Sequence, residues 1–217
     1  MIKLYGFWRS AAAFRVRMAL NLKGLAYEET MIDLDAGEQH GASYLSINPH
    51  ANVPTIFMDG VPPMTQSLAI LEYLEEAHPT PPLLPADAPA RAYVRALALI
   101  YAADHHPLIV PRIRRYLTGT LGVSDEQRTD WIRHWFREGL VQGEAKLREA
   151  AQAGRFSLGD APTIADLCLM SQAMGARGFG ITTDDLPITH RIVEACLAID
   201  AIGRALPLKQ PGAPASH

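Results

Sequence analysis

The chain has 217 residues, of which 48% are hydrophobic, and this supplies enough apolar material for one large or two smaller globular domains. Its formal net charge is only -3, with 20 basic and 23 acidic residues spread along the sequence. Because there is no basic tract, a nucleic acid or an anionic membrane surface is disfavoured as a partner, and small metabolites are favoured.

The N-terminal residues and the cysteines carry further expectations. Arg9, Arg15 and Arg17 interrupt the apolar start of the chain and break any signal-peptide core, so we expect a cytoplasmic protein. No apolar run is long enough to span a bilayer. The two cysteines, Cys168 and Cys196, lie within apolar helical patterns that predict buried, unreactive thiols. Thiol chemistry in the N-terminal half therefore needs a sulfur that a ligand brings.

The predicted elements of the first 80 residues alternate between strand and helix. Their order is βαβ and then ββα, with Gly24, Asn48-Pro49 and Asp59-Gly60 as turn signals between them. The expected strands are residues 2–8, 26–34, 54–58 and 61–65, and the expected helices are residues 10–23 and 66–77. This order predicts a thioredoxin-like α/β domain over residues 1–80, in which helices cover both faces of a mixed sheet.

The second half of the chain reads as helical. Five prolines in residues 78–89 cannot continue a helix, and we place an interdomain linker at residues 81–89. Strand signals then largely disappear, so we expect an all-α domain over residues 90–217, with a loose tail from Pro207. The expected helices are residues 90–117, 124–153, 163–177 and 187–206.

Ser10 lies where the first strand ends and the first helix begins. A serine at this position can act as an ordinary N-cap. Its hydroxyl can also donate a hydrogen bond to a thiolate near the positive end of the helix, which lowers the thiol pKa from about 8.5 and gives a better nucleophile. The two roles are compatible. Thr163 and Asp166 have the spacing of a capping box, and we interpret this pair as structural.

Four short patterns occur in the order seen in glutathione transferases. They are Trp8-Arg9-Ser10, Asn48-Pro49 through Val53-Pro54, Gln66-Ser67, and Thr163-Ile164-Ala165-Asp166. The stretches FWRSAAAFRVRMALNLKG, QSLAILEYLEE and PLLPADAPARAYVRALA are most similar to the zeta class, which includes maleylacetoacetate and maleylpyruvate isomerases. The resemblance covers nearly the whole chain. It implies a glutathione transferase fold, glutathione as the cofactor and a homodimer.

The resemblance also implies which residues hold glutathione. Pro54 is cis in the family, which aims the backbone of Val53 at the cysteinyl part of glutathione, whereas a trans strand-initiating proline is the general expectation. Gln66 and Ser67 open a helix that can hold the γ-glutamyl carboxylate, with capping as the alternative. The expected glutathione-binding set is Ser10, Gln39, His40, Val53, Pro54, Gln66, Ser67 and His106.

Two polar stretches belong to this set. Gln39 or His40 is expected to contact the glycyl end of glutathione, with a solvated loop as the alternative. His106 stands at a family position facing the active cleft, where it would bind a carboxylate of the substrate or of glutathione. Its neighbours Asp104 and His105 do not make a metal site with it, because successive helical residues point about 100° apart. We expect no metal.

Arginines are the expected partners of the electrophile. The natural zeta-class substrates are dicarboxylates with a cis double bond, and arginine binds carboxylates with a permanent, bidentate charge. By resemblance to maleylpyruvate isomerases, Arg9, Arg112 and Arg177 are expected to bind the substrate, each with a surface ion pair as the alternative. The expected activity is glutathione-dependent cis–trans isomerisation by thiolate addition, bond rotation and elimination, with Ser10 and Arg9 as catalytic residues.

Two departures from the family pattern bear on the substrate. Ala12 stands where the zeta pattern often has cysteine; maleylpyruvate isomerases also lack that cysteine, which favours maleylpyruvate over maleylacetoacetate. Ile109 and Val110 replace a polar pair, which predicts a more apolar site wall. That change motivates the alternative of a glutathione S-transferase that conjugates or dehalogenates small electrophiles. A third alternative, a non-catalytic glutathione-fold binding protein, is disfavoured by the retention of Ser10.

Overall fold

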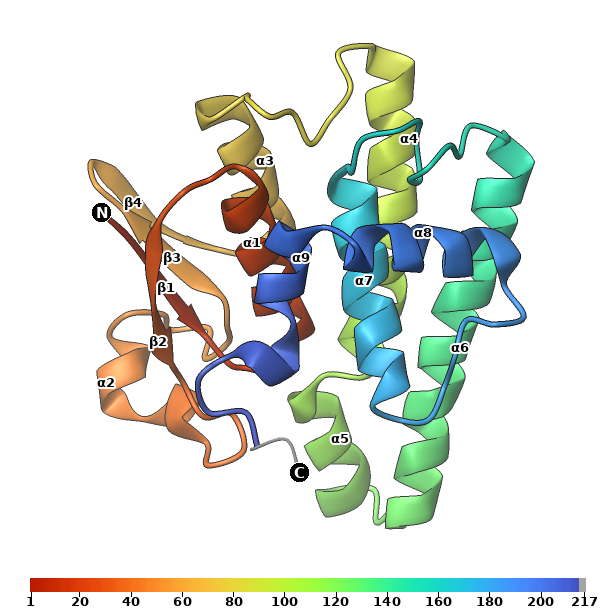
Figure 1. Cartoon of the computed structure of the whole chain (residues 1–217). Coiled ribbons are helices and arrows are strands. Elements are labelled where there is room, and N and C mark those ends of the chain that lie inside the picture. Colours follow the sequence, from red (N-terminus) through yellow and green to blue (C-terminus); the bar gives the residue numbers. More distant parts are fainter. Residues whose placement is uncertain (215–217) are drawn as a thin grey trace. The chain divides into compact units, whose positions relative to one another are not determined.

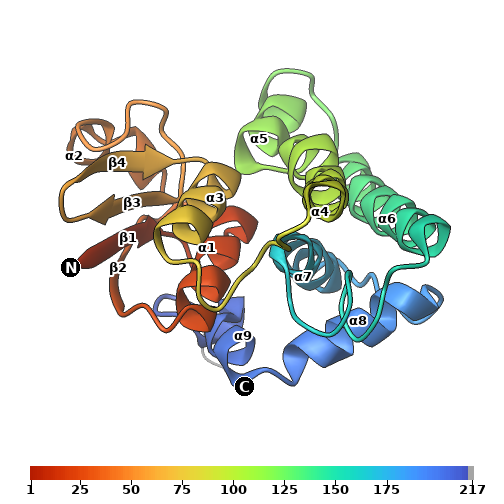
Figure 2. The same ribbon diagram turned by 90° about the horizontal axis from the view of Figure 1, so that it is seen from above.

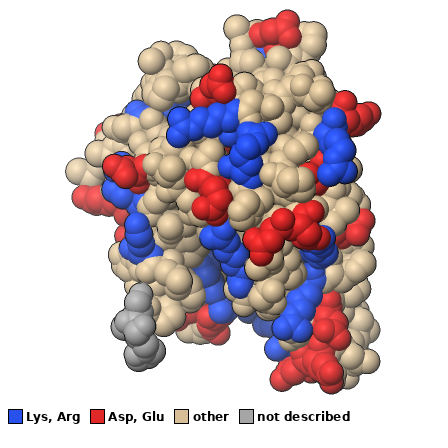
Figure 3. All heavy atoms as spheres, turned by 45° about the vertical axis from the view of Figure 1, so that its right-hand side comes forward, with Lys and Arg blue, Asp and Glu red and all other residues tan. Residues whose placement is uncertain are grey.

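The computed structural model describes residues 1–214. By its internal contacts the chain forms two compact units: the first unit combines Met1–Pro82 with the segment that starts at Ile199, and the second unit is Leu83–Ala198. Cys168 and Cys196 are buried in the second unit, as predicted. No helix in residues 1–214 is long and apolar enough to cross a membrane. Basic and acidic side chains are interspersed on the face shown in Figure 3.

The first unit contains a mixed four-stranded sheet with the order β2-β1-β3-β4. β1 pairs in parallel with β2 and antiparallel with β3, which pairs antiparallel with β4. The strands are β1 (Ile2–Gly6), β2 (Tyr27–Met31), β3 (Thr55–Met58) and β4 (Val61–Thr65), and the helices are α1 (Ala11–Leu22), α2 (Ala42–Leu45), α3 (Ser67–Ala77) and α9 (Asp200–Ala205), with 3₁₀ turns at Glu38–His40 and Pro207–Lys209.

Helices cover both faces of this sheet (Figures 1 and 2). On one face α1 packs against α3, and the fully buried Leu4 of β1 belongs to the core beneath them. Successive strand residues point to opposite faces, so Tyr5 lies on the other side, where its ring is 6.1 Å from that of Tyr44 in α2. The predicted thioredoxin-like α/β arrangement is confirmed.

The second unit is helical. Its helices are α4 (Ala88–Leu99), α5 (Pro111–Gly119), α6 (Asp125–Ala150), α7 (Ile164–Arg177) and α8 (Pro187–Leu197), with a π-helical turn at Ile100–His105 and a 3₁₀ turn at His106–Leu108. α7 packs against α4, α6 and α8, which surround it in Figure 2. Because it has neighbours on several sides, α7 is apolar nearly all round, with Leu167, Leu169 and Met170 fully buried.

Two expected helices are interrupted. The helix expected over residues 90–117 changes to π and 3₁₀ turns after Leu99, since Pro107 has no N–H to donate to the preceding turn, and a new helix begins at Pro111. The helix expected over residues 187–206 is broken at Ile199, which adopts an extended conformation with φ -92° and ψ 116°.

The segment after this break belongs to the first unit rather than to the predicted helical region 90–217. α9 packs against α1, and Asn21 donates a side-chain hydrogen bond to the carbonyl of Ala201 at 2.9 Å. The tail from Pro207 was expected to be loose, but its residue Gln210 is bonded to α9. The Gln210 side-chain amide donates a hydrogen bond to the Arg204 carbonyl at 2.8 Å. The last three residues of that tail, 215–217, lie outside the described residues. The boundaries of a glutathione-binding domain at 1–80, a linker at 81–89 and a helical domain at 90–217 stay a prediction.

The capping box at the start of α7 is confirmed. The buried Asp166 carboxylate accepts hydrogen bonds from the Thr163 N–H at 2.7 Å and from the Thr163 hydroxyl at 2.8 Å. It also accepts one from the Ser157 N–H at 2.8 Å, so it ties the preceding loop to the helix. Burial raises the pKa of the Asp166 carboxyl, and these hydrogen bonds oppose that rise. Asp166 is a structural centre of the second unit.

Candidate functional site

The strand register gathers three of the predicted motifs at one end of the sheet. Tyr5 pairs with Thr55, and Thr55 pairs with Thr65 on its other side. The chain that leaves β1 towards Ser10, the chain that enters β3 through Val53-Pro54, and the chain that leaves β4 at Gln66 are therefore neighbours. All three lie in the first unit, whose sheet brings them together.

Ser10 is the N-cap of α1. Its backbone is extended, with φ -67° and ψ 115°, and its Oγ accepts a hydrogen bond from the Ala13 N–H at 3.2 Å. This contact uses the hydroxyl only as an acceptor, so its own hydrogen is available to donate. The positive end of the α1 dipole adds to the attraction for an anion at this point. The geometry supports the capping role and the thiolate-binding role at the same time.

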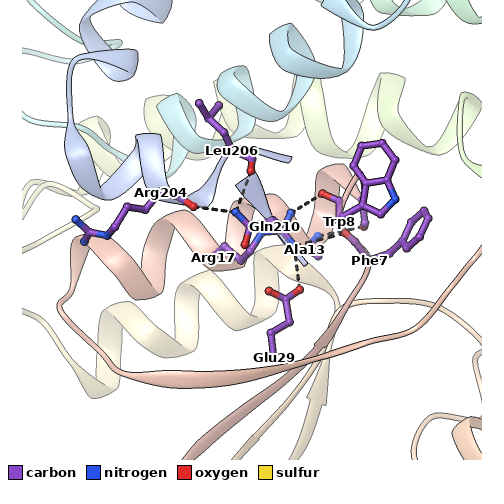
Figure 4. A network of polar contacts seen from close by, with 9 residues as sticks. Phe7, Trp8, Ala13, Arg17, Glu29, Arg204, Leu206 and Gln210 are labelled. Carbon is purple, nitrogen blue, oxygen red and sulfur yellow. Dashed lines mark hydrogen bonds and ion pairs between the residues drawn. The ribbon is translucent and has the colours of Figure 1, made fainter. Parts of the chain in front are cut away.

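A buried arginine fixes the loop that carries Ser10 (Figure 4). Arg17 Nη1 donates to the Glu29 carboxylate at 2.9 Å and to the Phe7 carbonyl at 3.4 Å, and its Nη2 donates to the Trp8 carbonyl at 3.0 Å. The Phe7 carbonyl also accepts from the Ser10 N–H at 2.9 Å. Burial raises the pKa of the Glu29 carboxyl, and the charge and hydrogen bond of Arg17 oppose that rise.

The sequence interpretation missed this pair. Arg17 entered it only as a charge that interrupts an apolar N-terminus, and Glu29 was a polar residue of an expected strand. One signal was present, because Arg15 and Arg17 fall inside an otherwise apolar helical pattern, and both are buried. A charged residue inside an apolar helix requires a partner.

Gln66 and Ser67 begin α3, as predicted. Gln66 has φ 69°, in a region that residues other than glycine rarely adopt and that is enriched at ligand-binding sites. Ser67 is buried, and its hydroxyl accepts a hydrogen bond from Arg15 Nη1 at 3.1 Å. Arg15, which the sequence interpretation treated only as a charge that interrupts the apolar start of the chain, thus places a positive charge at the start of α3.

The peptide bond between Val53 and Pro54 is cis, as the family resemblance implied. A second cis bond, Thr80–Pro81, was not predicted. Val53 is buried in a cluster with Phe7, Ile32 and Tyr44. The residue before Pro54 and the end of β1 therefore share one small core.

Gln39 and His40 differ in their surroundings. Both belong to the 3₁₀ turn Glu38–His40, but Gln39 is only 2% exposed whereas His40 points to solvent. Within residues 1–214, Gln39 Oε1 is buried without a hydrogen-bond partner. Because buried polar atoms are almost always paired, this amide has the character of a group that a bound ligand completes. It fits a peptide-like ligand such as glutathione.

The predicted substrate arginines have different neighbours. Arg9 forms an ion pair with Asp35 and lies over the rings of Phe7 and Trp8, 5.6 and 5.8 Å from their centroids. Arg177, the last residue of α7, is paired with Glu194 at 3.2 Å.

Two further predicted residues lie, like Arg177, in the second unit. Arg112 is exposed on α5 and has no ion pair within residues 1–214, and His106 is half-buried in its 3₁₀ turn. Ile109, expected in an apolar site wall, is instead a core residue that is 2% exposed. Its carbonyl accepts a hydrogen bond from Arg114 Nε at 2.6 Å. Of the expected apolar pair, only the half-buried Val110 retains a partly exposed side chain.

Comparison with known proteins identifies the family. Residues 1–76 match the glutathione S-transferase N-terminal domain. The chain is 42% identical to a probable maleylacetoacetate isomerase of Vibrio cholerae, over 97% of each chain. The crystal structure of a maleylacetoacetate isomerase from Methylobacterium extorquens AM1 with bound malonate and glutathione has a TM-score of 0.95 and 54% identity, covering 98% of this chain and 100% of that one.

A second solved structure is the holo form of a maleylpyruvate isomerase, described as a bacterial glutathione S-transferase of the zeta class. It has a TM-score of 0.93 and 41% identity, and the match covers 98% of this chain and 100% of that one. This chain therefore belongs to the zeta class of glutathione transferases, in the branch that contains the maleylacetoacetate and maleylpyruvate isomerases.

Proposed function

We propose that this protein is a glutathione-dependent cis–trans isomerase of a maleyl-type dicarboxylate. The observation that carries the proposal is the convergence of Ser10, the cis Val53–Pro54 bond and Gln66 at one end of the sheet, with the Ser10 hydroxyl available as a donor. A relative that is 54% identical binds glutathione together with malonate, itself a dicarboxylate. Gln39, whose buried Oε1 has no partner within residues 1–214, and Ser67 are the further candidates to hold glutathione.

Ser10 and Arg9 have different roles in the proposed isomerisation. When bound, glutathione supplies a thiolate that adds reversibly to the double bond, so that the resulting single bond can rotate before elimination. Ser10 donates a hydrogen bond to the sulfur, and the N-terminus of α1 favours its negative charge, so the thiolate forms at neutral pH. Arg9 stabilises the negative charge that develops on the conjugated carbonyl oxygen of the substrate.

Within this function we propose maleylpyruvate as the preferred substrate over maleylacetoacetate. The support is Ala12, which leaves no protein thiol beside Ser10. The maleylpyruvate isomerases that the chain resembles also lack this cysteine. Purified protein with glutathione should convert maleylpyruvate to fumarylpyruvate in a proton NMR time course, with a kcat/KM at least tenfold above that for maleylacetoacetate. No turnover without glutathione is expected. A stable glutathione conjugate in place of the trans isomer would support a transferase acting on small electrophiles instead.

Replacing Arg9 with alanine should lower kcat/KM for the dicarboxylate about tenfold, through a fall in kcat as well as a rise in KM, the effect of losing one charge-assisted hydrogen bond of about 1.5 kcal/mol. The Arg9–Asp35 pair is about half exposed, so it adds little stability and can exchange partners with a substrate carboxylate. Arg137→Ala is a matched control, because Arg137 forms a similarly exposed pair with Asp185 on the second unit. Steady-state kinetics with unchanged KM and turnover in Arg9→Ala would refute the assignment.

The other predicted contacts remain proposals. Arg112 and Arg177 are proposed to bind substrate carboxylates, and His106 a carboxylate of the substrate or of glutathione. We also propose a homodimer, which rests on the family resemblance and is tested by light scattering of the purified protein, and a cytoplasmic location.

A further inference from the structure

The Arg17–Glu29 ion pair is almost completely buried, and a contribution to stability does not explain its presence. The side chains are 0% and 9% exposed, and α1 supplies the arginine while β2 supplies the glutamate. A buried ion pair rarely stabilises a fold more than well-packed apolar residues of similar size would. The other groups that Arg17 contacts indicate a different role for the pair.

Those groups are the backbone carbonyls of Phe7 and Trp8, just beyond the end of β1. Arg17 reaches both, at 3.4 and 3.0 Å, with different nitrogens of its guanidinium group. The Phe7 carbonyl also closes a turn by accepting the Ser10 N–H at 2.9 Å. Figure 4 shows the guanidinium side of Arg17 directed at this loop. The backbone immediately before Ser10 is thus held by a planar fork that no other cationic side chain reproduces.

Gly6 shows that the fold makes room for this arrangement. A Cβ added at Gly6 would lie 2.1 Å from Glu29 Oε1 and 3.3 Å from the Ala13 Cβ. Gly6 does not have a positive φ, so its backbone does not call for glycine. A side chain at this position would instead displace the Glu29 carboxylate, which lies against Gly6 where it pairs with Arg17.

We infer that Arg17 is a positioning residue of the reaction: with Glu29 as its anchor, it fixes the loop from Phe7 to Ser10 so that the Ser10 hydroxyl points at the bound thiolate. This inference rests on the proposed function, because it acts through Ser10. Arg17 itself touches neither glutathione nor substrate. Its removal changes how well Ser10 stabilises the thiolate, more than how tightly glutathione binds.

The test is the pKa of the glutathione thiol bound to the full-length protein, followed by the ultraviolet absorbance of the thiolate during a pH titration. In Arg17→Lys, which keeps the charge but loses the fork, we expect this pKa to rise by about one unit, equivalent to about tenfold less thiolate well below the pKa. The dissociation constant of glutathione should change by less than about threefold, and kcat should fall more than KM rises. Glu29→Gln should show the same change with a smaller size.

A matched control is available in the same unit. Lys23 and Glu75 form another buried pair, with side-chain exposures of 0% and 7%, and Lys23 binds the carbonyls of His78 and Pro81, at the end of α3. Lys23→Met should lower the melting temperature at least as much as Arg17→Lys does, without moving the pKa of the bound thiol. An equal pKa rise in Lys23→Met would mean that general loosening of the unit explains the effect, and would overturn the inference.

Combining the changes separates the two proposals. If Arg17 acts through Ser10, the double variant Ser10→Ala/Arg17→Lys should have the same bound-thiol pKa as Ser10→Ala alone. A further rise in the double variant, or an unchanged pKa in folded Arg17→Lys, would overturn the positioning role and leave the proposed function intact. An unchanged pKa in Ser10→Ala itself would overturn the role of Ser10 and, with it, that of Arg17.

Discussion

Replacing Ser10 with alanine is expected to lower kcat/KM of the glutathione-dependent isomerisation about a hundredfold, the effect of removing one aligned donor from a developing or bound anion. The hydroxyl lies at the N-terminus of α1, and because its oxygen accepts the Ala13 N–H, its hydrogen is available to donate. The variant also loses an N-cap, at a cost of about 1 kcal/mol in the free energy of unfolding. It should therefore remain folded while its bound glutathione is mostly a thiol at neutral pH.

Two further variants separate catalysis from capping. Ser10→Asp keeps a good N-cap but has no proton to donate when ionised, so it should recover stability without recovering activity. Ser124→Ala removes an equivalent cap from α6, where Ser124 accepts the Gln127 N–H at 3.1 Å, and it should lose stability without losing activity. Initial rates and urea denaturation measure both quantities. Full activity in folded Ser10→Ala would show that the thiolate is stabilised without Ser10.

Replacing Asp166 with alanine is expected to reduce the free energy of unfolding of the second unit by about 3–4 kcal/mol, because buried donors left without acceptors cost about 1–3 kcal/mol each. The carboxylate accepts from the N–H groups of Thr163 and Ser157 and from the Thr163 hydroxyl, all at 2.7–2.8 Å, with no exposure to solvent. Water cannot replace these contacts at a fully buried position without opening the start of α7.

An exposed cap of the same chemistry provides the comparison. Asp87 caps α4 by accepting the Ala90 N–H at 3.0 Å, and Asp87→Ala should cost only about 1 kcal/mol in urea or thermal unfolding. The fraction of Asp166→Ala that is folded should keep its specific activity at low temperature, as expected for a structural residue. A variant of normal stability with no activity would instead make Asp166 part of the catalytic machinery.

The part of the fold that can be predicted from the sequence is the part whose elements end at turn residues such as glycine and proline. The four strands, α1 and α3 of the first unit agree with the sequence interpretation to within a few residues, because turn signals such as Gly24 and Asp59-Gly60 mark their ends. The change to a π-helical turn at Ile100 and the break at Ile199 have no glycine or proline at the break itself. The first change precedes Pro107, which lies further along the chain, whereas the second accompanies the packing of α9 against α1, which a local pattern does not record.

The site divides in the same way. Ser10, Pro54 and Gln66 belong to short motifs, and the roles of Ser10 as an N-cap and of Gln66 at a helix start are visible near each residue, whereas the cis state of Pro54 was implied only by the family resemblance. The pairs that support them join residues far apart in the chain, as the 12 positions from Arg17 to Glu29 illustrate. Such pairing follows only once β1, β2 and α1 are assembled, so sequence reasoning found the residues that lie in motifs and missed the buried pair of Arg17 and Glu29 that supports them.

The return of α9 to the first unit has a consequence for protein synthesis. β1 to α3 leave the ribosome before the whole of the second unit, but the face of α1 that α9 covers has no partner until residues 200–205 have also emerged. The second unit is continuous in sequence, whereas the first is completed only by a segment made more than a hundred residues later. During that interval the face of α1 that α9 later covers is exposed on the nascent chain. A chaperone or a neighbouring nascent chain can bind this face in competition with α9.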